Sequence, residues 1–410
     1  MGSFLHSFRA PNGMTIIVKE NHSTPIVSMA AYFRGGLCAE TEEKQGLTHF
    51  MQRMLMKGTR YRTAEEIASE LEFLGASMAP FTGKDVFGAT LSSLSKHFAP
   101  ALQIYADCLM NPVFGAPESE RERAVILSDI AKKKDDPISY CLELCERILY
   151  KKHPYRFAIP GREETVKTFT PERLAEWHHF LYSPEQMVVA VVGDMPAKLA
   201  RDLVIEAFED FHPHKVRLPA TPREGPLRQT REIVEKRDKR QVAVSIGFHA
   251  PPFGPDGYFA FDVLEHVLSG MGSRLFIELR DKQGLAYVVN CTYEARRDMG
   301  SFKIYIGTSE ERRERSRAAM LEELEKLKET PIGQAELRRT KKYMLGLYEI
   351  SLQRNSAQAS RLAYYEIMGM GYRLLDEVPR QIRKVTSADV LDAAREHLDT
   401  AHYAIAQVYP

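Results

Sequence analysis

The sequence predicts an α+β protein made of two similar domains, and three observations support this fold class. The chain has 410 residues, which is more than one ordinary hydrophobic core contains. Hydrophobic residues make up 44% and charged residues 27%, as is usual in globular proteins. An order of strands and helices in the first half recurs after roughly 200 residues, which indicates two copies of one unit.

Strand and helix patterns alternate through the first half. β-Branched and aromatic residues bordered by glycine turns mark the strands, and apolar periodicity marks the helices. Thr63, followed three residues later by Glu66, is a capping-box pattern at the start of one helix. These patterns predict strands at 14–19, 27–33, 85–94 and 186–194, and helices at 46–56, 63–74 and 117–131.

A proline-punctuated stretch without periodicity, Phe211 to Arg228, divides the chain. The second half then repeats the pattern, with strands predicted at 241–248, 301–307 and 403–408 and helices at 259–269 and 310–329. The predicted domains are therefore residues 1–212 and 229–410, with a linker at 213–228.

Charge and cysteine content exclude several classes of protein. A formal net charge of +1 argues against nucleic-acid binding, which usually requires a basic excess. No run of apolar residues is long enough for a membrane span, and the N-terminus lacks a secretory pattern. We expect a cytoplasmic protein, or a periplasmic one if a leader was removed. Five cysteines favour free thiols; Cys141 and Cys145 lie four apart, but no second pair completes a metal site.

Residues 46–59, Gly-Leu-Thr-His-Phe-Met-Gln-Arg-Met-Leu-Met-Lys-Gly-Thr, carry the most specific motif. This segment resembles the pitrilysin/insulinase (inverzincin) peptidase family, whose inverted zinc motif is H-x-x-E-H on a helix. Asn111-Pro112-Val113-Phe114, His153-Pro154-Tyr155 and Gly161 extend the resemblance over essentially the whole chain. It implies two homologous pitrilysin-like domains, each with an antiparallel sheet packed by helices, in a clam-like (LuxS/metalloenzyme-like) arrangement.

The motif departs from the family at the residues that perform its chemistry. Two histidines four apart on a helix can share a zinc ion, and the glutamate between them acts as the general base. Here only His49 remains, because Gln52 replaces the base and Arg53 replaces the second histidine. An amide is no base at neutral pH, and a guanidinium opposes metal binding. The expected distal ligand falls on Asp129, one methylene shorter than the family's glutamate.

The degenerate zinc motif therefore comprises His49, Gln52, Arg53 and Asp129, and the sequence predicts that this chain binds no metal. His49 is then a packed or hydrogen-bonded helix residue. We expect Arg53 and Asp129 to form an ion pair in the vacated site; a separation beyond salt-bridge length would contradict this.

The strand that holds substrate in the family is altered as well. The resemblance places an Asn-Ala pair on this edge strand, where the present chain has Ala79 and Pro80. Proline cannot donate a ladder hydrogen bond, so we expect this strand to pair poorly with a peptide.

The second half retains its part of the family pattern. Residues 273–287 match the C-terminal signature, in which Arg280 and Tyr287 fall at the spacing of the Arg/Tyr pair that contacts substrate. A guanidinium can bind a peptide carbonyl or carboxylate, and a phenol can stabilise an oxyanion. The alternative is a surface ion-pair arginine and a half-buried strand aromatic. Asp262, Glu265 and His266 mimic a metal motif, but without a downstream partner we interpret them as an ordinary helix face.

The resemblance implies a function. In two-chain members of the family, one subunit supplies H-x-x-E-H and the other supplies the Arg/Tyr pair, so we expect a non-catalytic subunit that orients unfolded peptides. Zinc would then belong to a homologous partner with an intact motif, although the isolated chain could form a homodimer. The short loop Leu268–Gly272 favours a bacterial-type pair over a mitochondrial one. The alternatives are a scaffold without a role in proteolysis and, as a third interpretation, an active peptidase with an altered zinc site.

Overall fold

The structure is a computed structural model that describes residues 5–237 and 241–409. The chain forms two compact units, each assembled from three segments. Unit 1 contains Met1–Ile130, Phe157–Ala220 and Ile350–Leu375, and unit 2 contains Ala131–Arg156, Thr221–Glu349 and Asp376–Pro410. The chain passes from one unit to the other at five points. The point between Ala220 and Thr221 lies in the predicted linker, whereas the other four lie inside the predicted domains. The two units are therefore interleaved in sequence.

Unit 1 is built on a six-stranded sheet with the order β1-β2-β6-β3-β5-β4. Its strands are β1 (Leu5–Arg9), β2 (Thr15–Glu20), β3 (Ile26–Arg34), β4 (Ser77–Thr82), β5 (Val86–Leu94) and β6 (Met187–Gly193). Neighbouring strands are antiparallel except β2 and β6, which are parallel. The predicted antiparallel sheet is therefore present, with this one parallel pair as the exception. The chain between these two strands is long and contains three other strands and several helices, so β6 can return in the same direction as β2.

The helices of unit 1 include those of the motif region. They are α1 (Leu47–Met54), α2 (Ala64–Phe73), α3 (Phe98–Met110), α6 (Glu163–Val166), α7 (Pro171–Leu181), α8 (Ala197–Ala207) and α12 (Asn355–Ile367). Three helices pass from one unit to the other along the chain: α4 (Ala116–Asp135), α11 (Gln334–Ser351) and α13 (Leu374–Lys384).

Unit 2 repeats five of the six strands. Its sheet has the order β7-β11-β8-β10-β9, from β7 (Arg231–Lys236), β8 (Val242–Ala250), β9 (Val288–Glu294), β10 (Gly300–Thr308) and β11 (Ala404–Tyr409). The parallel pair is β7 and β11, the first and last strands of this unit, which correspond to β2 and β6 of unit 1. Its helices are α5 (Pro137–Leu149), α9 (Tyr258–Leu268), α10 (Arg313–Glu329) and α14 (Ser387–His397). This shared strand order confirms two copies of one α+β unit.

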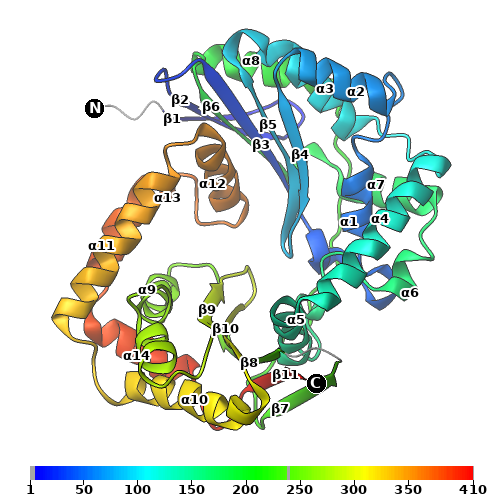
Figure 1. The fold of residues 1–410 in the computed structure, drawn as a ribbon. Coiled ribbons are helices and arrows are strands. Elements are labelled where there is room, and N and C mark those ends of the chain that lie inside the picture. The colour runs from blue at the N-terminus through cyan, green and yellow to red at the C-terminus, as the bar shows by residue number, and fades with distance from the viewer. Residues whose placement is uncertain (1–4, 238–240, 410) are drawn as a thin grey trace. The chain divides into compact units, whose positions relative to one another are not determined.

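Each unit incorporates a helix from the other half of the sequence. Helix α12, drawn in brown in Figure 1, contacts β3, β5 and β6 of unit 1. Helix α5, drawn in dark green, contacts β8, β10 and β11 of unit 2. These helices cover central strands of each sheet, which helps to explain why β6 is buried along its whole length.

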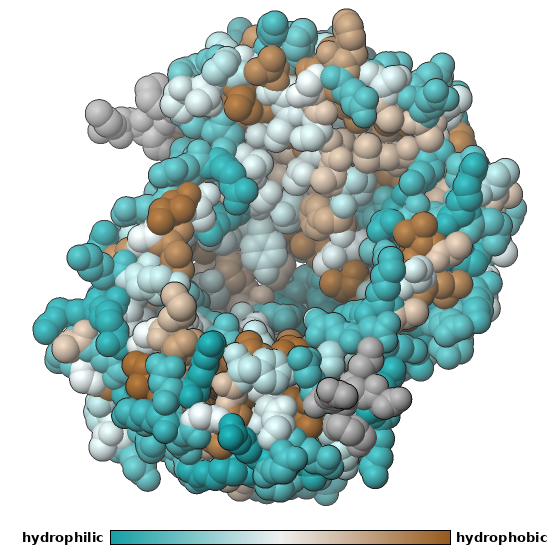
Figure 2. Space-filling model, viewed as in Figure 1, coloured by the Kyte–Doolittle hydropathy of each residue, from teal (hydrophilic) through white to brown (hydrophobic). Residues whose placement is uncertain are grey.

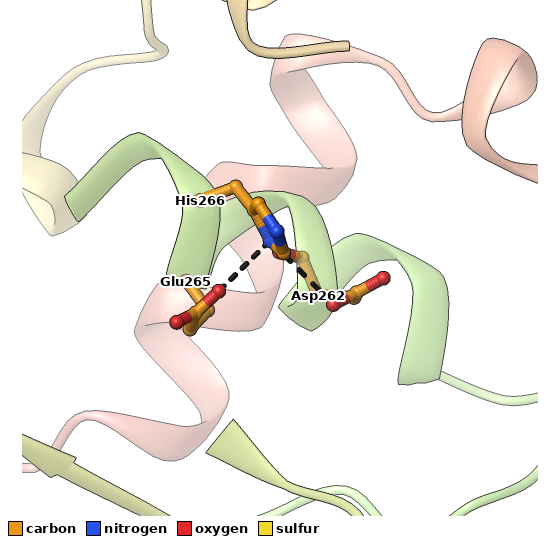
Figure 3. A group of neighbouring side chains, drawn as sticks. All are labelled: Asp262, Glu265 and His266. Carbon is orange, nitrogen blue, oxygen red and sulfur yellow. Dashed lines mark hydrogen bonds and ion pairs between the residues drawn. The ribbon is translucent and has the colours of Figure 1, made fainter. Parts of the chain in front are cut away.

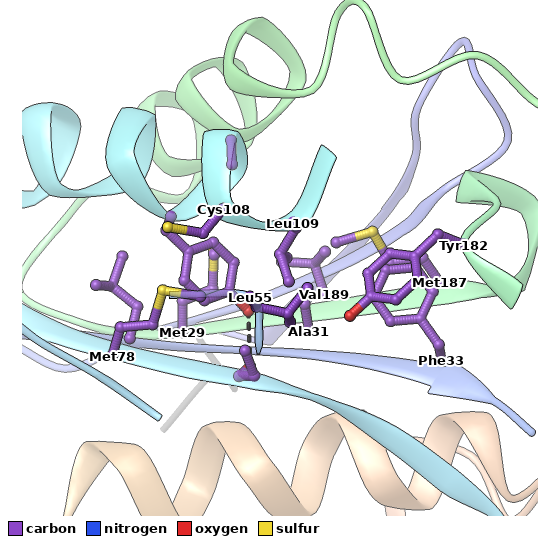
Figure 4. Close-up of a cluster of buried hydrophobic side chains, with 14 of the residues drawn as sticks. Met29, Ala31, Phe33, Leu55, Met78, Cys108, Leu109, Tyr182, Met187 and Val189 are labelled. Carbon is purple, nitrogen blue, oxygen red and sulfur yellow. Dashed lines mark hydrogen bonds between the residues drawn. The ribbon is translucent and has the colours of Figure 1, made fainter. Parts of the chain in front are cut away.

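A continuous hydrophobic core fills the space between the sheet of unit 1 and the helices on its other face. Phe33 of β3 packs against the rings of Phe87 and Tyr182, at centroid distances of 5.3 and 4.5 Å. Figure 4 shows the side chains that meet there, among them Met29, Ala31, Leu55, Met78, Cys108, Leu109, Met187 and Val189. This core fixes α1 and its neighbours against the sheet.

Local predictions are confirmed at several points. Thr63 caps α2 with the predicted capping box, since its hydroxyl accepts from the Glu66 amide and the Glu66 carboxylate accepts from the Thr63 amide. The five cysteines are free and buried; Cys141 and Cys145 contact strand carbonyls of unit 2. Within the described residues, no helix is long and apolar enough to cross a membrane. Hydrophilic side chains dominate the face shown in Figure 2.

Candidate functional site

Helix α1 presents the degenerate motif, and a buried carboxylate fixes its start. Glu40 accepts hydrogen bonds from the backbone amides of Gly46 (2.9 Å) and Thr48 (2.8 Å). Gly46 has φ +90°, and a Cβ there would lie 2.5 Å from the carbonyl oxygen of Pro160. Trp177 adds an indole hydrogen bond to the Thr48 hydroxyl at 3.0 Å. These contacts hold the first turn of the helix in place.

The buried position of Glu40 makes the stability of unit 1 depend on pH. Burial raises the pKa of Glu40 to about 7, although the two amide hydrogen bonds favour the carboxylate. A raised carboxyl pKa contributes stability that is complete below the ordinary pKa of 4.5 and is lost as the pH rises through 7. We therefore expect the free energy of unfolding of the wild type to fall by about 3 kcal/mol between pH 4.5 and 8, relative to Glu40→Gln.

Urea unfolding at several pH values measures this difference. Glu43→Gln changes an exposed neighbour in the same way and should leave the pH dependence as it is in the wild type. If Glu40→Gln followed the wild-type pH profile, the assignment of this titration to Glu40 would be wrong.

His49 lies on α1 as a neutral imidazole. Burial, and next the charge of Arg53, lower its pKa to about 4. His49 therefore carries no charge at neutral pH and can accept or donate a hydrogen bond in the neutral form.

Gln52 is almost completely buried, with 2% of its surface exposed. Its Nε2 donates to the phenol oxygen of Tyr182 at 2.8 Å. Its Oε1 is buried and makes no hydrogen bond to any of the described residues, 5–237 and 241–409. Gln52, which occupies the position of the family's base, therefore has a hydrogen-bonded amide nitrogen and an amide oxygen without a hydrogen bond.

Arg53 is neutralised by two carboxylates of α4. Its closest partner is Glu122, with Nη2 to Oε1 at 2.6 Å, and Asp129 lies at 3.8 Å from Nη1. The predicted contact between Arg53 and Asp129 is thus present, but Glu122 is the stronger partner. Lys57 also contacts Glu122, at 3.1 Å. Two cations and two carboxylates balance each other beside α1.

Glu122 and Tyr182 contact the motif residues although neither was predicted from the sequence. Glu122 precedes Asp129 by two helical turns, so its spacing on α4 was a usable signal that both side chains share one face. Tyr182 approaches Gln52 from 130 residues away, and no local pattern indicates that contact.

A pocket of about 490 Å³ opens beside the motif residues of α1. Its polar lining comprises His49, Gln52, Arg53, Lys57 and Thr82, and its apolar lining comprises Met56, Ala64, Ala68, Pro80, Phe81 and Ile159. We call this cavity the α1 pocket. Strand β4, which supplies three of these residues, is an edge strand of the unit 1 sheet. Pro80 pairs with Ala89 in register, so one position of this edge has no amide hydrogen.

Unit 2 places Arg280 and Tyr287 on consecutive segments. Arg280 lies in a π-helix, Phe276–Lys282, and its guanidinium stacks over the Phe276 ring at 4.7 Å. Throughout the described chain, Arg280 makes no ion pair. π-Helical turns are rare and often occur at functional sites. The guanidinium is therefore available for a ligand.

Tyr287 precedes β9 and is 45% exposed. Its ring lies over Gly307 of β10, where a Cβ would be 2.4 Å from the Tyr287 Cζ. Its amide donates to the Gly307 carbonyl at 3.1 Å. Glycine at position 307 thus makes room for the ring, while the phenol remains accessible.

Asp262, Glu265 and His266 form a compact cluster on α9 (Figure 3). Their nearest ligand atoms lie within 4.8 Å of one another, close enough to share a metal ion. The His266 Nδ1 already contacts the Glu265 carboxylate at 2.8 Å and the Asp262 carbonyl at 2.9 Å. Burial opposes its charge, but Glu265 and Asp262 raise the pKa of His266 to about 9. A metal ion would have to replace the Nδ1 proton of this ion-paired imidazole.

Two family models match the chain. The model described as Insulinase (Peptidase family M16) matches residues 15–160, and the model described as Peptidase M16 inactive domain matches residues 168–344. The chain belongs to peptidase family M16. The prediction of the pitrilysin/insulinase family is confirmed.

M16 relatives and solved structures cover the full length of the chain. The "Uncharacterized zinc protease YmxG" of Bacillus subtilis is 29% identical over 98% of both chains. An uncharacterized zinc protease of Mycobacterium tuberculosis is also 29% identical, over 98% of this chain and 92% of that protein. A protease from Helicobacter pylori (TM-score 0.92, 21% identity, 100% of both chains) shares the fold. A Pseudomonas fluorescens structure titled peptidase M16 inactive domain also shares it (TM-score 0.92, 23% identity, 99% and 98% covered).

Zinc is implied by this M16 membership, but the donor set around His49 does not fit it. Zinc requires nitrogen, sulfur or carboxylate ligands from three or four residues. Here Arg53 has no lone pair to offer, Gln52 faces Tyr182, and Asp129 faces the Arg53 guanidinium. Of the four motif residues, only His49 offers zinc a donor atom that is not engaged by another side chain, and a single imidazole does not bind zinc tightly.

Proposed function

We propose that this M16 protein is the non-catalytic, substrate-orienting subunit of a heterodimeric zinc peptidase that cleaves unfolded peptides. The observation that carries the proposal is the contrast between the motif on α1 and the Arg280/Tyr287 pair of unit 2. Arg53 of the α1 motif is held by the carboxylates of Glu122 and Asp129. Arg280 and Tyr287 are exposed, and Arg280 makes no ion pair with residues 5–237 or 241–409. A homologous partner with intact H-x-x-E-H would supply zinc and the general base.

The chemistry of the two retained residues supports an orienting role. A free guanidinium can bind a carbonyl or carboxylate of the peptide, and a phenol can hydrogen-bond the oxyanion that forms during hydrolysis. Gly307 keeps the Tyr287 ring in a defined position against β10. Fixed donors of this kind contribute to catalysis because they need no rearrangement in the transition state.

Reconstitution with the partner tests the proposal. We expect the double variant Arg280→Ala/Tyr287→Phe to lower kcat/KM of the pair by on the order of 10²- to 10³-fold, because both substrate contacts are lost. Size-exclusion chromatography should show the same heterodimer as the wild type.

Arg339→Ala/Tyr343→Phe is the matched control, since it removes the same groups from the exposed surface of α11. It should leave turnover unchanged. Equal turnover of the Arg280/Tyr287 variant and the wild type would contradict the orienting role. It would favour a scaffold that binds peptides or partners without assisting proteolysis.

An active peptidase with an altered site is the second candidate, because relatives carry the name zinc protease. The closed network around Arg53 argues against it. Mass-spectrometric metal analysis of the purified chain distinguishes the two: one zinc per chain, lost in His49→Ala, would support the altered-site peptidase over the non-catalytic subunit.

A further inference from the structure

The cluster of Asp262, Glu265 and His266 on α9 places three side chains that can bind metal on one face of a helix (Figure 3). Residues three and four apart in a helix lie on neighbouring turns, so their side chains meet. One ligand atom of each residue lies within 4.8 Å of the other two, close enough for one ion to reach all three. The sequence alone favours an ordinary helix face here; the structure adds the mutual distances and the burial of the side chains.

The cluster is largely shielded from water and lies on a well-anchored helix. The side chains of Asp262, Glu265 and His266 are 26%, 14% and 23% exposed. Phe261 and Leu264 of the same helix are fully buried in the core of unit 2. The backbone that carries the three side chains is therefore fixed, and little rearrangement is needed for them to share an ion.

The cluster contains more negative than positive charge. His266 Nδ1 contacts the Glu265 carboxylate at 2.8 Å and the Asp262 carboxylate at 3.6 Å. In the part of the chain that the structure describes, neither carboxylate forms an ion pair with a lysine or an arginine. One imidazolium can balance only one of two carboxylates, and an unbalanced charge that is shielded from water is unfavourable. A divalent ion in place of the imidazole proton would balance both.

The donor atoms indicate which kind of ion fits. Calcium and magnesium are bound in proteins by oxygen ligands, whereas imidazole nitrogen suits transition-metal ions such as zinc. Carboxylate oxygens are ligands for both classes of ion. A set of one nitrogen and two carboxylates therefore fits a divalent transition-metal ion better than calcium or magnesium.

We propose that Asp262, Glu265 and His266 form a binding site for a divalent first-row transition-metal ion in unit 2. The ion takes one nitrogen from His266 and one oxygen from each carboxylate, the imidazole proton leaves to solvent, and water fills the other coordination positions. The site belongs to a different helix and a different unit from the degenerate motif on α1. It therefore goes beyond the proposed function and does not depend on it.

Equilibrium titration of the full chain with Mn²⁺ tests the site, because electron paramagnetic resonance measures the free ion. Three ligands from one helix release an ion readily, so binding is measured with metal present rather than as metal content after dialysis. We expect about one Mn²⁺ per chain, which Zn²⁺ displaces at lower concentration than Mg²⁺ does. Asp262→Asn and His266→Gln should each weaken Mn²⁺ binding at least about tenfold.

Two control variants locate the ion. Asp399→Asn/His402→Gln removes another carboxylate–imidazole pair, 2.8 Å apart and more exposed, and should bind Mn²⁺ like the wild type. His49→Ala should also bind like the wild type, which separates this site from the motif on α1. Cooperative urea unfolding without metal shows that each variant is folded.

Three results would overturn the proposal. The first is that the wild type binds no Mn²⁺, or binds it no better than Asp262→Asn and His266→Gln do. The second is that Mg²⁺ displaces Mn²⁺ as readily as Zn²⁺ does, because the imidazole would then not be a ligand. The third is loss of binding in His49→Ala, which would place the ion at the motif on α1.

Discussion

Replacing Glu146 with leucine is expected to destabilise unit 2 by about 3–5 kcal/mol, because it leaves buried cations without their main partner. Glu146 lies on α5 and accepts hydrogen bonds from Arg296 and from Lys303 Nζ, the latter at 2.5 Å. The side chains of all three residues are less than one-tenth exposed. Among the described residues, Glu294, which is 45% exposed, is the carboxylate that would remain to balance the two cations.

This network joins α5 to the sheet of unit 2. Glu146 comes from the first half of the sequence, whereas Arg296 and Lys303 come from the second, 150 and 157 residues away. Gly247 of β8 permits the close approach, since a Cβ there would lie 2.7 Å from Cys145 Sγ. Loss of the network should therefore loosen α5 before the rest of the unit.

Urea unfolding followed by circular dichroism measures the effect, and the single tryptophan, Trp177, reports separately on unit 1 by fluorescence. Glu143→Leu is the control on the same helix: its carboxylate contacts Lys133 at 2.6 Å near the surface. That exposed pair should contribute less than about 1 kcal/mol. Similar losses for Glu143→Leu and Glu146→Leu would show that the buried network does not hold α5.

The double substitution Gln52→Glu/Arg53→His is expected to create zinc binding in this chain. It removes the guanidinium that closes the site and places two imidazoles four residues apart on α1, with Asp129 on the facing helix. We expect about one zinc ion per chain after dialysis, with affinity on the order of a hundredfold or more above the wild type.

Zinc content by mass spectrometry decides this prediction. Gln52→Glu alone keeps Arg53 and should retain no zinc, because the cation still opposes the metal. If the single variant and the wild type held as much zinc as the double variant, Arg53 would not be the group that excludes it. Such a result would also weaken the proposed non-catalytic role.

Local chemistry made much of the fold predictable. The predicted helix at 63–74 corresponds to α2 because Thr63 and Glu66 satisfy its first amides in a way visible from residue types alone. The predicted strand at 186–194 corresponds to β6, whose apolar run reflects burial on both faces. The turn glycines and apolar periodicity that mark such elements act over a few residues.

Contacts between distant residues were not predictable in this way. The parallel pairing of β2 with β6 and of β7 with β11 depends on long crossovers rather than on strand composition. The packing of α5 on the unit 2 sheet and of α12 on the unit 1 sheet likewise has no local signal. An amphipathic pattern indicates that a helix packs against a core, but not which sheet it packs on.

The sequence by itself determined the family and the two-unit α+β fold, and from Gln52 and Arg53 it predicts a zinc motif without its base and second histidine. These conclusions follow from residue identity at fixed spacing on one helix. Only the tertiary structure decided that Glu122, 69 residues away, is the main partner of Arg53. It also decided that Tyr182 engages one end of the Gln52 amide and leaves the other free. Such pairings arise when the core brings separate helices together, because a buried charge or amide must take its partner from whatever side chains the fold places beside it.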